Sequence, residues 1–182
     1  KKRLEVAKRR GTETNLSLIY VPSVGGQDEL VFDGGGFALN SQAELVHSMP
    51  QFEENVSVIS LERRALRIEP AAGLQAKTYG PTAEIYEALK LALSDYVRKN
   101  RLPGVLIGLS GGIDSALSLA IAVDALGSDK VEAVLMPSRY TANISQEDAV
   151  KEAEILGVVY QNISIEPIVE SFIHALSTAF KD

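Results

Sequence analysis

The residues best suited to chemistry form one glycine-rich segment near the middle of the chain, Gly108-Leu109-Ser110-Gly111-Gly112-Ile113-Asp114-Ser115. Glycine has no Cβ, so its backbone N–H group can approach an anion closely and its φ can be positive. The hydroxyls of Ser110 and Ser115 can add further donors. A helix that begins here would also present its first N–H groups and the positive end of its dipole. The segment therefore predicts a loop that binds phosphate groups.

The loop fits neither of two common nucleotide-binding patterns. It is not a Walker A loop, because no Lys-Ser or Lys-Thr follows the glycines, and the spacing of Gly108, Gly111 and Gly112 is not that of G-x-G-x-x-G. Asp114 is the unusual residue, since a carboxylate repels phosphates unless a divalent cation lies between them, and this implies Mg²⁺. The alternative is that Asp114 only caps a helix and the glycines only form a tight turn.

Strands and helices alternate in residues 82–182, around this loop. Val105–Leu109 is a continuous apolar run, typical of a parallel strand that is buried on both faces. The other expected strands are 131–136 and 158–165. Helices are expected at 82–102, 114–126 and 167–180. One more helix is expected to begin at Ser145 and Asp148, which are spaced like a capping box, and to end at Gly157. These short spacings predict right-handed βαβ crossovers and an α/β fold with a doubly wound parallel sheet. Such a sheet binds ligands beyond the carboxyl ends of its strands, where the loop lies.

Residues 1–69 show a different sequence pattern. A short helix is expected first, followed by β structure with strands at 16–21, 30–32, 37–39, 44–47 and 56–61. Residues 70–81 have no clear period and carry Pro and Gly at both ends, so they are expected to be an interdomain linker. The predicted organisation is one domain over 1–69, a linker over 70–81 and a second domain over 82–182.

Composition excludes several classes of protein. The chain has no cysteine and two histidines, which argues against a disulfide framework, a thiolate zinc site and a cysteine or Ser-His-Asp nucleophile. Its net charge of −6 argues against a nucleic-acid coat. No apolar run is long enough to span a bilayer, and the basic start lacks the apolar core of a secretory signal. We therefore expect a cytoplasmic protein that binds neither nucleic acid nor membrane, cut from a longer chain.

Several segments resemble known families. Ser110–Ser115 resembles the S-G-G-x-D-S pyrophosphate loop of N-type ATP pyrophosphatases. The flanking segments 122–127 and 136–141, together with Ser145 and Asp148-Ala149, resemble NAD⁺ synthetases. Residues 25–34, with the sequence GGQDELVFDG, resemble the late part of the nitrilase-like glutaminase domain of glutamine-dependent NAD⁺ synthetases.

This resemblance implies a fold and an activity. Residues 1–69 would be the end of an α/β nitrilase-like sandwich, and residues 82–182 the start of an adenine nucleotide alpha hydrolase-like synthetase domain. The implied enzyme is a ligase that uses ATP and Mg²⁺ to amidate deamido-NAD⁺ through an acyl-adenylate, with ammonia from glutamine. A homo-oligomer is also expected. The open alternatives are another N-type ATP pyrophosphatase amidotransferase and a non-catalytic nucleotide-binding or assembly module.

The resemblance also implies the site residues. Those expected to bind ATP are Gly108, Leu109, Ser110, Gly111, Gly112, Ile113, Asp114, Ser115 and Met136, with Asp114 on the metal side. Arg139 is expected to contact a phosphate. The family hydrolyses glutamine with a Glu-Lys-Cys triad whose cysteine would lie upstream of residue 1, and later ligands for deamido-NAD⁺ and metal would lie beyond Asp182. No glutaminase residue is therefore assigned in this chain, and Glu29 is not placed in the triad.

Overall fold

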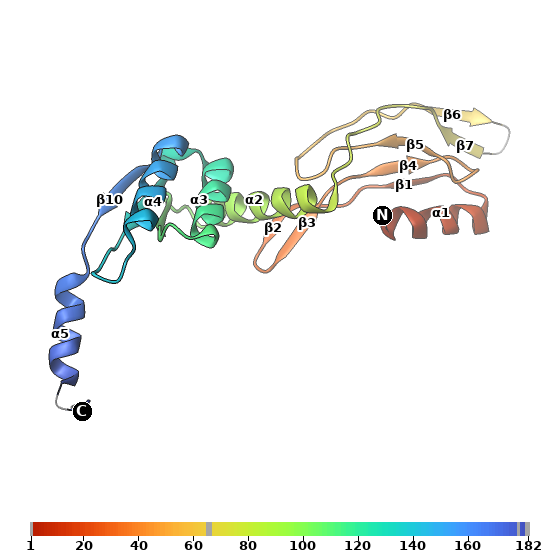
Figure 1. Ribbon diagram of the computed structural model, residues 1–182. Helices are drawn as coiled ribbons and strands as arrows, with labels where there is room; N and C mark the ends of the chain where they lie inside the picture. Colours follow the sequence, from red (N-terminus) through yellow and green to blue (C-terminus); the bar gives the residue numbers. More distant parts are fainter. Residues whose placement is uncertain (1, 65–66, 178, 181–182) are drawn as a thin grey trace. The chain divides into compact units, whose positions relative to one another are not determined.

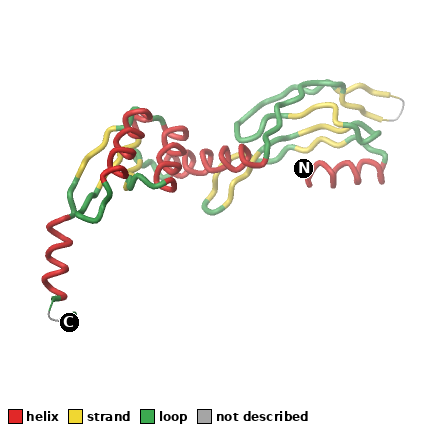
Figure 2. Tube along the Cα trace, in the orientation of Figure 1, coloured by secondary structure: helices red, strands yellow, loops and turns green. Residues whose placement is uncertain are grey.

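A computed structural model describes residues 2–64, 67–177 and 179–180 (Figure 1). The chain divides into two compact units, Lys1–Asp95 and Tyr96–Asp182, and helix α2 (Pro81–Lys99) runs through the division. Figure 2 shows that strands and loops make up most of the first unit, whereas helices alternate with strands in the second.

The first unit begins with a helix that covers a small antiparallel sheet. Helix α1 spans Lys2–Thr14, and the strands are β1 (Leu18–Tyr20), β2 (Val24–Gln27), β3 (Leu30–Asp33), β4 (Phe37–Leu39), β5 (Leu45–Ser48), β6 (Leu61–Arg64) and β7 (Arg67–Pro70). The sheet has the order β1-β4-β5, while β2–β3 and β6–β7 are separate antiparallel pairs. Its core is a cluster of Ala7, Phe37 and Leu39 with Leu4 and Leu18 packed against it. The predicted short helix followed by β structure is confirmed.

The β2–β3 hairpin is fastened to α2 through a glycine. The backbone N–H of Gly26 donates to Oδ2 of Asp95 at 2.8 Å, and Asp95 is buried. A Cβ added at Gly26 would lie 3.1 Å from Cα of Ala92, so a larger residue would require the hairpin or α2 to shift by a few tenths of an ångström. The GGQDE segment thus has a structural role on the surface of α2.

Residues 56–81 contain one predicted strand and the expected linker. The predicted strand 56–61 is wrong except for Leu61, because residues 56–60 pair with no strand in the described chain; Val56 is 97% and Val58 90% exposed. The expected linker lies along β5, where Gly73 N donates to Val46 O. By contact it belongs to the first unit. The division of the chain into domains at 69 and 82 stays a prediction.

The second unit is a three-stranded parallel sheet with helices. Its elements are β8 (Val105–Gly108), α3 (Ile113–Leu126), a 3-10 turn η1 (Ser128–Lys130), β9 (Val131–Leu135), α4 (Asn143–Leu156), β10 (Val159–Asn162) and α5 (Glu166–Leu176). The strand order is β10-β9-β8, and both pairings are parallel, which confirms the predicted parallel α/β sheet. Gly127 and Gly157, with φ of 86° and 68°, end α3 and α4 as predicted.

The two faces of this sheet differ in burial in the described part of the unit. Helices α3 and α4 pack against the sheet and against each other, and Leu119 of α3, Ala149 of α4 and Ala133 of β9 are buried. On the opposite face Leu106 is 66% exposed, so the prediction that β8 is buried on both faces is wrong in this unit. An apolar strand is buried on both faces only when a second layer covers it. The doubly wound arrangement therefore stays a prediction.

Helix boundaries differ from the predictions in two places. Helix α4 begins at Asn143 and its N-cap is Ala142, with no side-chain hydrogen bond, so the predicted capping-box start at Ser145 and Asp148 is wrong. Helix α5 ends at Leu176 rather than Phe180. Among the described residues no helix combines the length and the apolarity that crossing a membrane requires.

Candidate functional site

The glycine-rich loop lies between β8 and α3, as predicted. Gly108 pairs with Val134 of β9, and Leu109 N continues the ladder with a hydrogen bond of 2.9 Å to Val134 O. Gly111 then adopts a φ of 78°, and Gly112 is the extended N-cap from which α3 begins. The loop is therefore a tight turn from the carboxyl end of a parallel strand into the start of a helix.

The two serine hydroxyls hold the loop together. Ser115 Oγ donates to Gly112 O at 3.0 Å and lies 3.0 Å from Ser110 Oγ, and it accepts the Ser110 N–H at 3.2 Å. Ser110 Oγ in turn accepts the Gly112 N–H at 3.2 Å. These serines, expected as donors to a ligand, are engaged with each other and with the loop backbone. The network fixes the loop before any ligand arrives.

Several loop N–H groups are left for a ligand. Within the described residues, no hydrogen-bond acceptor pairs with the backbone N–H groups of Gly111, Ile113, Asp114 and Ser115. The last three belong to the first turn of α3, where the helix supplies no internal acceptor and its dipole is positive. A cluster of N–H donors at this position suits an anion such as a phosphate group.

Gly111 is also required by packing. A Cβ at this residue would lie 2.0 Å from Ser145 O, and its positive φ disfavours any L side chain. Gly111 therefore lets the loop touch the first turn of α4. At Gly112, by contrast, a Cβ would meet only Ser110 Oγ, at 3.4 Å.

Asp114 is the second residue of α3 and is exposed. The N-cap is Gly112, which makes no side-chain cap hydrogen bond, so the alternative that Asp114 is only an N-cap is wrong. No group of three or more His, Asp or Glu side chains able to hold a metal lies together in the described part of the chain. A single carboxylate beside a phosphate loop still fits Mg²⁺, which typically takes one or two carboxylates and fills its shell with phosphate oxygens and water.

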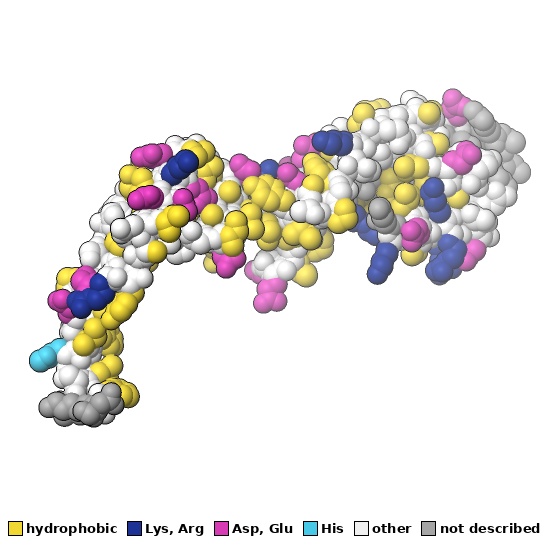
Figure 3. All heavy atoms as spheres, viewed as in Figure 1, with side chains coloured by type: hydrophobic (Ala, Val, Ile, Leu, Met, Phe, Trp, Pro, Cys, Tyr) yellow, Lys and Arg dark blue, Asp and Glu magenta, His cyan; other side chains and the backbone are white. Residues whose placement is uncertain are grey.

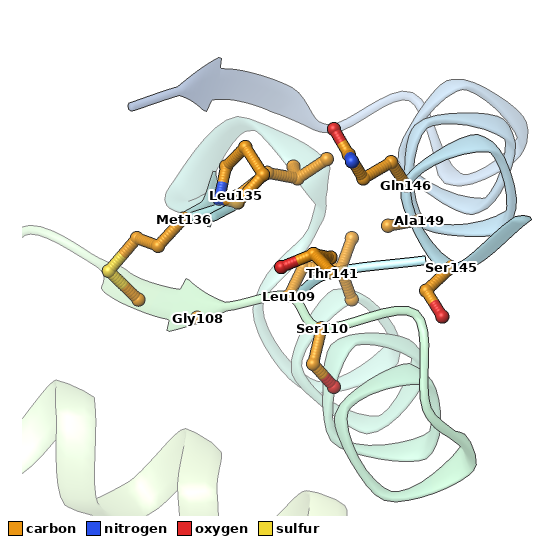
Figure 4. Close-up of a pocket in the computed structure, with 10 residues that line it drawn as sticks. Gly108, Leu109, Ser110, Leu135, Met136, Thr141, Ser145, Gln146 and Ala149 are labelled. Carbon is orange, nitrogen blue, oxygen red and sulfur yellow. The ribbon is translucent and has the colours of Figure 1, made fainter. Parts of the chain in front are cut away.

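A pocket of about 190 Å³ opens beside the loop. Its walls come from β8, the end of β9 and the start of α4: Gly108, Leu109, Ser110, Leu135, Met136, Pro137, Thr141, Ser145, Gln146 and Ala149. Figure 4 shows Met136 on the side opposite Gln146 and Ala149, with Ser110 and Thr141 between them. Met136 is 51% exposed and its Cε lies 3.3 Å from the position of a Cβ on Gly108, so it forms a wall and not part of the core.

The structure brings together only some of the predicted residues. Gly108, Leu109, Ser110 and Met136 line the pocket, while Gly111 to Ser115 form the loop next to it. The remaining wall residues were not predicted. Thr141, Ser145 and Ala149 lie in the segments that resemble NAD⁺ synthetases, but the sequence gives no reason to assign them to a pocket. Gln146 lies in the first turn of α4.

Arg139 is engaged with carboxylates of α5. Its Nε donates to Glu166, and another guanidinium nitrogen donates to Glu170 Oε1 at 2.7 Å. The hydrogen bond to Glu166 is the largest cause that raises the pKa of Arg139. A contact with phosphate, which stays a prediction, would require the guanidinium to exchange these partners.

The parallel sheet, with a glycine-rich loop at its carboxyl edge, is typical of α/β domains that bind ligands at this edge. The family model for NAD synthase matches residues 85–182, and the chain belongs to this family.

Relatives over the whole chain are glutamine-dependent NAD(+) synthetases. That of Acinetobacter baylyi is 44% identical over 181 residues, which cover 98% of this chain and 32% of that protein. That of Synechocystis sp. is 41% identical over 168 residues, 92% of this chain and 30% of that protein. The chain therefore spans about a third of the length of the curated relatives it matches.

Two solved structures share the fold. The glutamine-dependent NAD+ synthetase from Acinetobacter baumannii in complex with adenosine diphosphate matches 100% of this chain and 34% of its own, with a TM-score of 0.93 and 40% identity. The enzyme of the same name from Cytophaga hutchinsonii matches 98% of this chain and 36% of its own, with a TM-score of 0.78. At 18% identity, the second match shows the fold alone.

Proposed function

We propose that this chain carries the ATP site of a glutamine-dependent NAD⁺ synthetase, a ligase that amidates deamido-NAD⁺ to NAD⁺ through an acyl-adenylate. One observation carries the proposal: the pocket opens directly beside the unpaired N–H donors at the start of α3. A flat apolar group and a polyanion can therefore bind side by side, as in a nucleoside triphosphate.

The volume of the pocket supports the proposal that only the base of ATP enters it. At about 190 Å³ the pocket is smaller than the roughly 300–1,000 Å³ typical of sites that enclose a whole drug-sized molecule. The base of ATP would enter between Met136 and α4, and the phosphates would lie outside, over Gly111 to Ser115. The related Acinetobacter baumannii enzyme, 40% identical, was solved with ADP, which agrees with this assignment.

The loop would act on the first half of the reaction. AMP is transferred from ATP to the nicotinate carboxylate of deamido-NAD⁺, pyrophosphate leaves, and ammonia then displaces AMP from the acyl-adenylate. The N–H groups of Gly111, Ile113 and Asp114 would stabilise the charge that develops on the departing pyrophosphate. Asp114 would hold Mg²⁺, which supplies charge neutralisation when it is bound.

Ammonia production would belong to another part of a longer protein. Hydrolysis of glutamine through a thioester requires a cysteine, and this sequence has none. We propose that residues 1–69 are the end of the nitrilase-like glutaminase domain, as the GGQDE hairpin suggests. The cytoplasmic location and the homo-oligomer expected from the sequence belong to the same proposal.

The pocket offers a matched pair of variants for testing the proposal. Ala149 and Ala153 are both buried on α4, but only Ala149 lines the pocket. Leucine at either position overpacks the helix, at a cost of about 1–3 kcal/mol in stability. Ala149→Leu should also weaken the binding of MgATP about tenfold or more by filling the pocket, whereas Ala153→Leu should leave the affinity unchanged.

The measurement is calorimetric titration of the 182-residue chain with MgATP, below the unfolding temperatures of all variants. Another amidotransferase of the pyrophosphatase class would also bind ATP, so ATP binding alone does not identify this enzyme. MgGTP therefore serves as a second titrant, which records whether the site selects the adenine base. A parent chain that binds no ATP would overturn the proposal and favour an assembly module. Equal weakening by the two leucine variants would place the nucleotide elsewhere.

A further inference from the structure

The segment after β9 contains a compact turn at the rim of the pocket. Thr141 N donates to Ser138 O at 3.0 Å, and Ser138 N donates to Thr141 Oγ1 at 3.0 Å. Tyr140 N adds a hydrogen bond of 3.3 Å to Ser138 Oγ. Because these bonds close the turn on itself, residues 138–141 form one hydrogen-bonded piece. Thr141 is the member of this piece that lines the pocket.

Arg139 lies inside this turn, and one carboxylate outside the turn bonds to both its backbone and its side chain. Glu166 Oε2 accepts the backbone N–H of Arg139 at 2.6 Å, while Glu166 Oε1 accepts from the guanidinium of the same residue. Glu170 accepts a single further bond from Arg139. The side chain of Glu166 is 26% exposed and that of Glu170 is 63% exposed. Glu166 therefore fixes both the backbone and the side chain of Arg139, and Glu170 fixes only the end of the side chain.

The residues just before α5 bond to Pro137 of the same segment. Ile165 N donates to Pro137 O at 3.0 Å, and Ser164 Oγ donates to Pro137 O at 3.4 Å. None of the described residues of α5 is buried, so an apolar core does not hold this helix in place. Figure 3 shows acidic and basic side chains gathered at the start of α5, with hydrophobic side chains exposed along its length. The polar contacts at Pro137 and Arg139 are therefore what joins α5 to the pocket.

We propose that Glu166 is a positioning residue of the pocket, which holds the turn 138–141 through Arg139 and thereby sets where Thr141 lies in the wall. This inference rests on the proposed function for its ligand, but its geometry stands on the hydrogen bonds alone. The N–H of Arg139 lowers the pKa of the Glu166 carboxyl, so this side chain is ionised at neutral pH and makes charge-assisted bonds.

Three variants separate positioning from mere packing. Glu166→Ala removes both contacts with Arg139, and Glu166→Gln keeps an oxygen that can accept the backbone N–H but loses the charge. Glu170→Gln is the matched control, since it changes the same chemistry on the same helix but affects only the bond to the end of the Arg139 side chain. If Glu166 positions the turn, Glu166→Ala should weaken adenosine binding strongly, Glu166→Gln should weaken it partly, and Glu170→Gln should leave it almost unchanged.

The probes are adenosine and inorganic pyrophosphate, titrated separately into the 182-residue chain with Mg²⁺ present. Adenosine reports on the pocket wall, and pyrophosphate reports on the loop, which Glu166 does not touch. Glu166→Ala should weaken adenosine about tenfold and Glu166→Gln by a few-fold, while pyrophosphate changes less than about twofold. Equal loss for both probes, or equal adenosine affinity in Glu166→Ala and Glu170→Gln, would overturn the inference.

A readout without ligand keeps the two proposals apart. Hydrogen exchange of the Thr141 amide, which is bonded inside the turn, should be faster in Glu166→Ala than in the parent or in Glu170→Gln. A parent chain that binds neither adenosine nor MgATP refutes the ATP site, and the exchange rates then decide the role of Glu166. Unchanged exchange in Glu166→Ala refutes the positioning role whatever the chain binds.

Discussion

The replacement of Asp114 by asparagine separates the metal role of this residue from its role in the helix. Asp114 is the second residue of α3, is exposed and makes no cap hydrogen bond. In the helix its carboxylate can only interact with the positive end of the dipole, which is worth about 0.3–1 kcal/mol at such a position. Asp114→Asn should therefore lower the free energy of unfolding by no more than about 1 kcal/mol.

The expected loss of binding free energy is larger if Asp114 holds a cation. Two unit charges about 4 Å apart in water interact with about 1 kcal/mol, so a carboxylate and a divalent cation interact with roughly twice that. Because Asp114 is exposed, the aqueous value is the appropriate lower limit. A loss of about 2 kcal/mol corresponds to roughly 30-fold weaker binding of MgATP.

The assay is calorimetric titration of ATP with Mg²⁺ and, separately, with a chelator. The parent chain should bind ATP more tightly with Mg²⁺. Asp114→Asn should lose most of this difference and should bind metal-free ATP at least as tightly as the parent, because a repulsive charge has been removed. Asp129→Asn is the control, since Asp129 is an exposed aspartate at the start of η1, next to the amino end of β9. An unchanged Mg²⁺ dependence in Asp114→Asn would refute the metal role.

Three further outcomes are expected. Gly111→Ala should lower the melting temperature by several degrees, because its Cβ meets Ser145 O at a positive φ, whereas Gly112→Ala, which meets no backbone atom and changes only the N-cap residue of α3, should lower it by less. The backbone N–H of Arg139, more than its guanidinium, lowers the pKa of Glu166. The stabilisation from this contact is therefore present above the ordinary carboxyl pKa and is lost as the pH falls through the lowered pKa of Glu166, and an NMR titration of the Arg139 Nε signal would follow this loss. The chain without cysteine should release no glutamate from glutamine above the buffer blank.

The site loop was predictable from sequence because its signals are local. An apolar run, closely spaced glycines and the start of a helical pattern lie within a dozen residues or so, and each constrains its neighbours. The same holds for Gly127 and Gly157, which end their helices with a positive φ. The start of α4 was missed because Ser145 and Asp148 imitate a capping box, while Ala142, an extended residue without a capping side chain, is the real N-cap.

The wrong and missing predictions depend on partners distant in the sequence. Residues 56–60 have strand-like alternation, but a strand also needs a neighbour to pair with, and Val58 finds none in the described chain. Burial of both faces of β8 likewise needs a second layer over Leu106. The ion pair between Arg139 and Glu166 joins residues 27 positions apart, and no local pattern reveals it.

The loop divides its tasks among residue types in a way that explains its composition. Gly111 serves the packing of the loop against α4, since a side chain there would overlap Ser145 O. Ser110 and Ser115 bond to each other and to the backbone, so they fix the shape of the loop and do not need to reach the ligand. The N–H groups at the start of α3 then remain for the anion, already oriented. Since little reorganisation accompanies binding, their hydrogen bonds can contribute fully where negative charge develops.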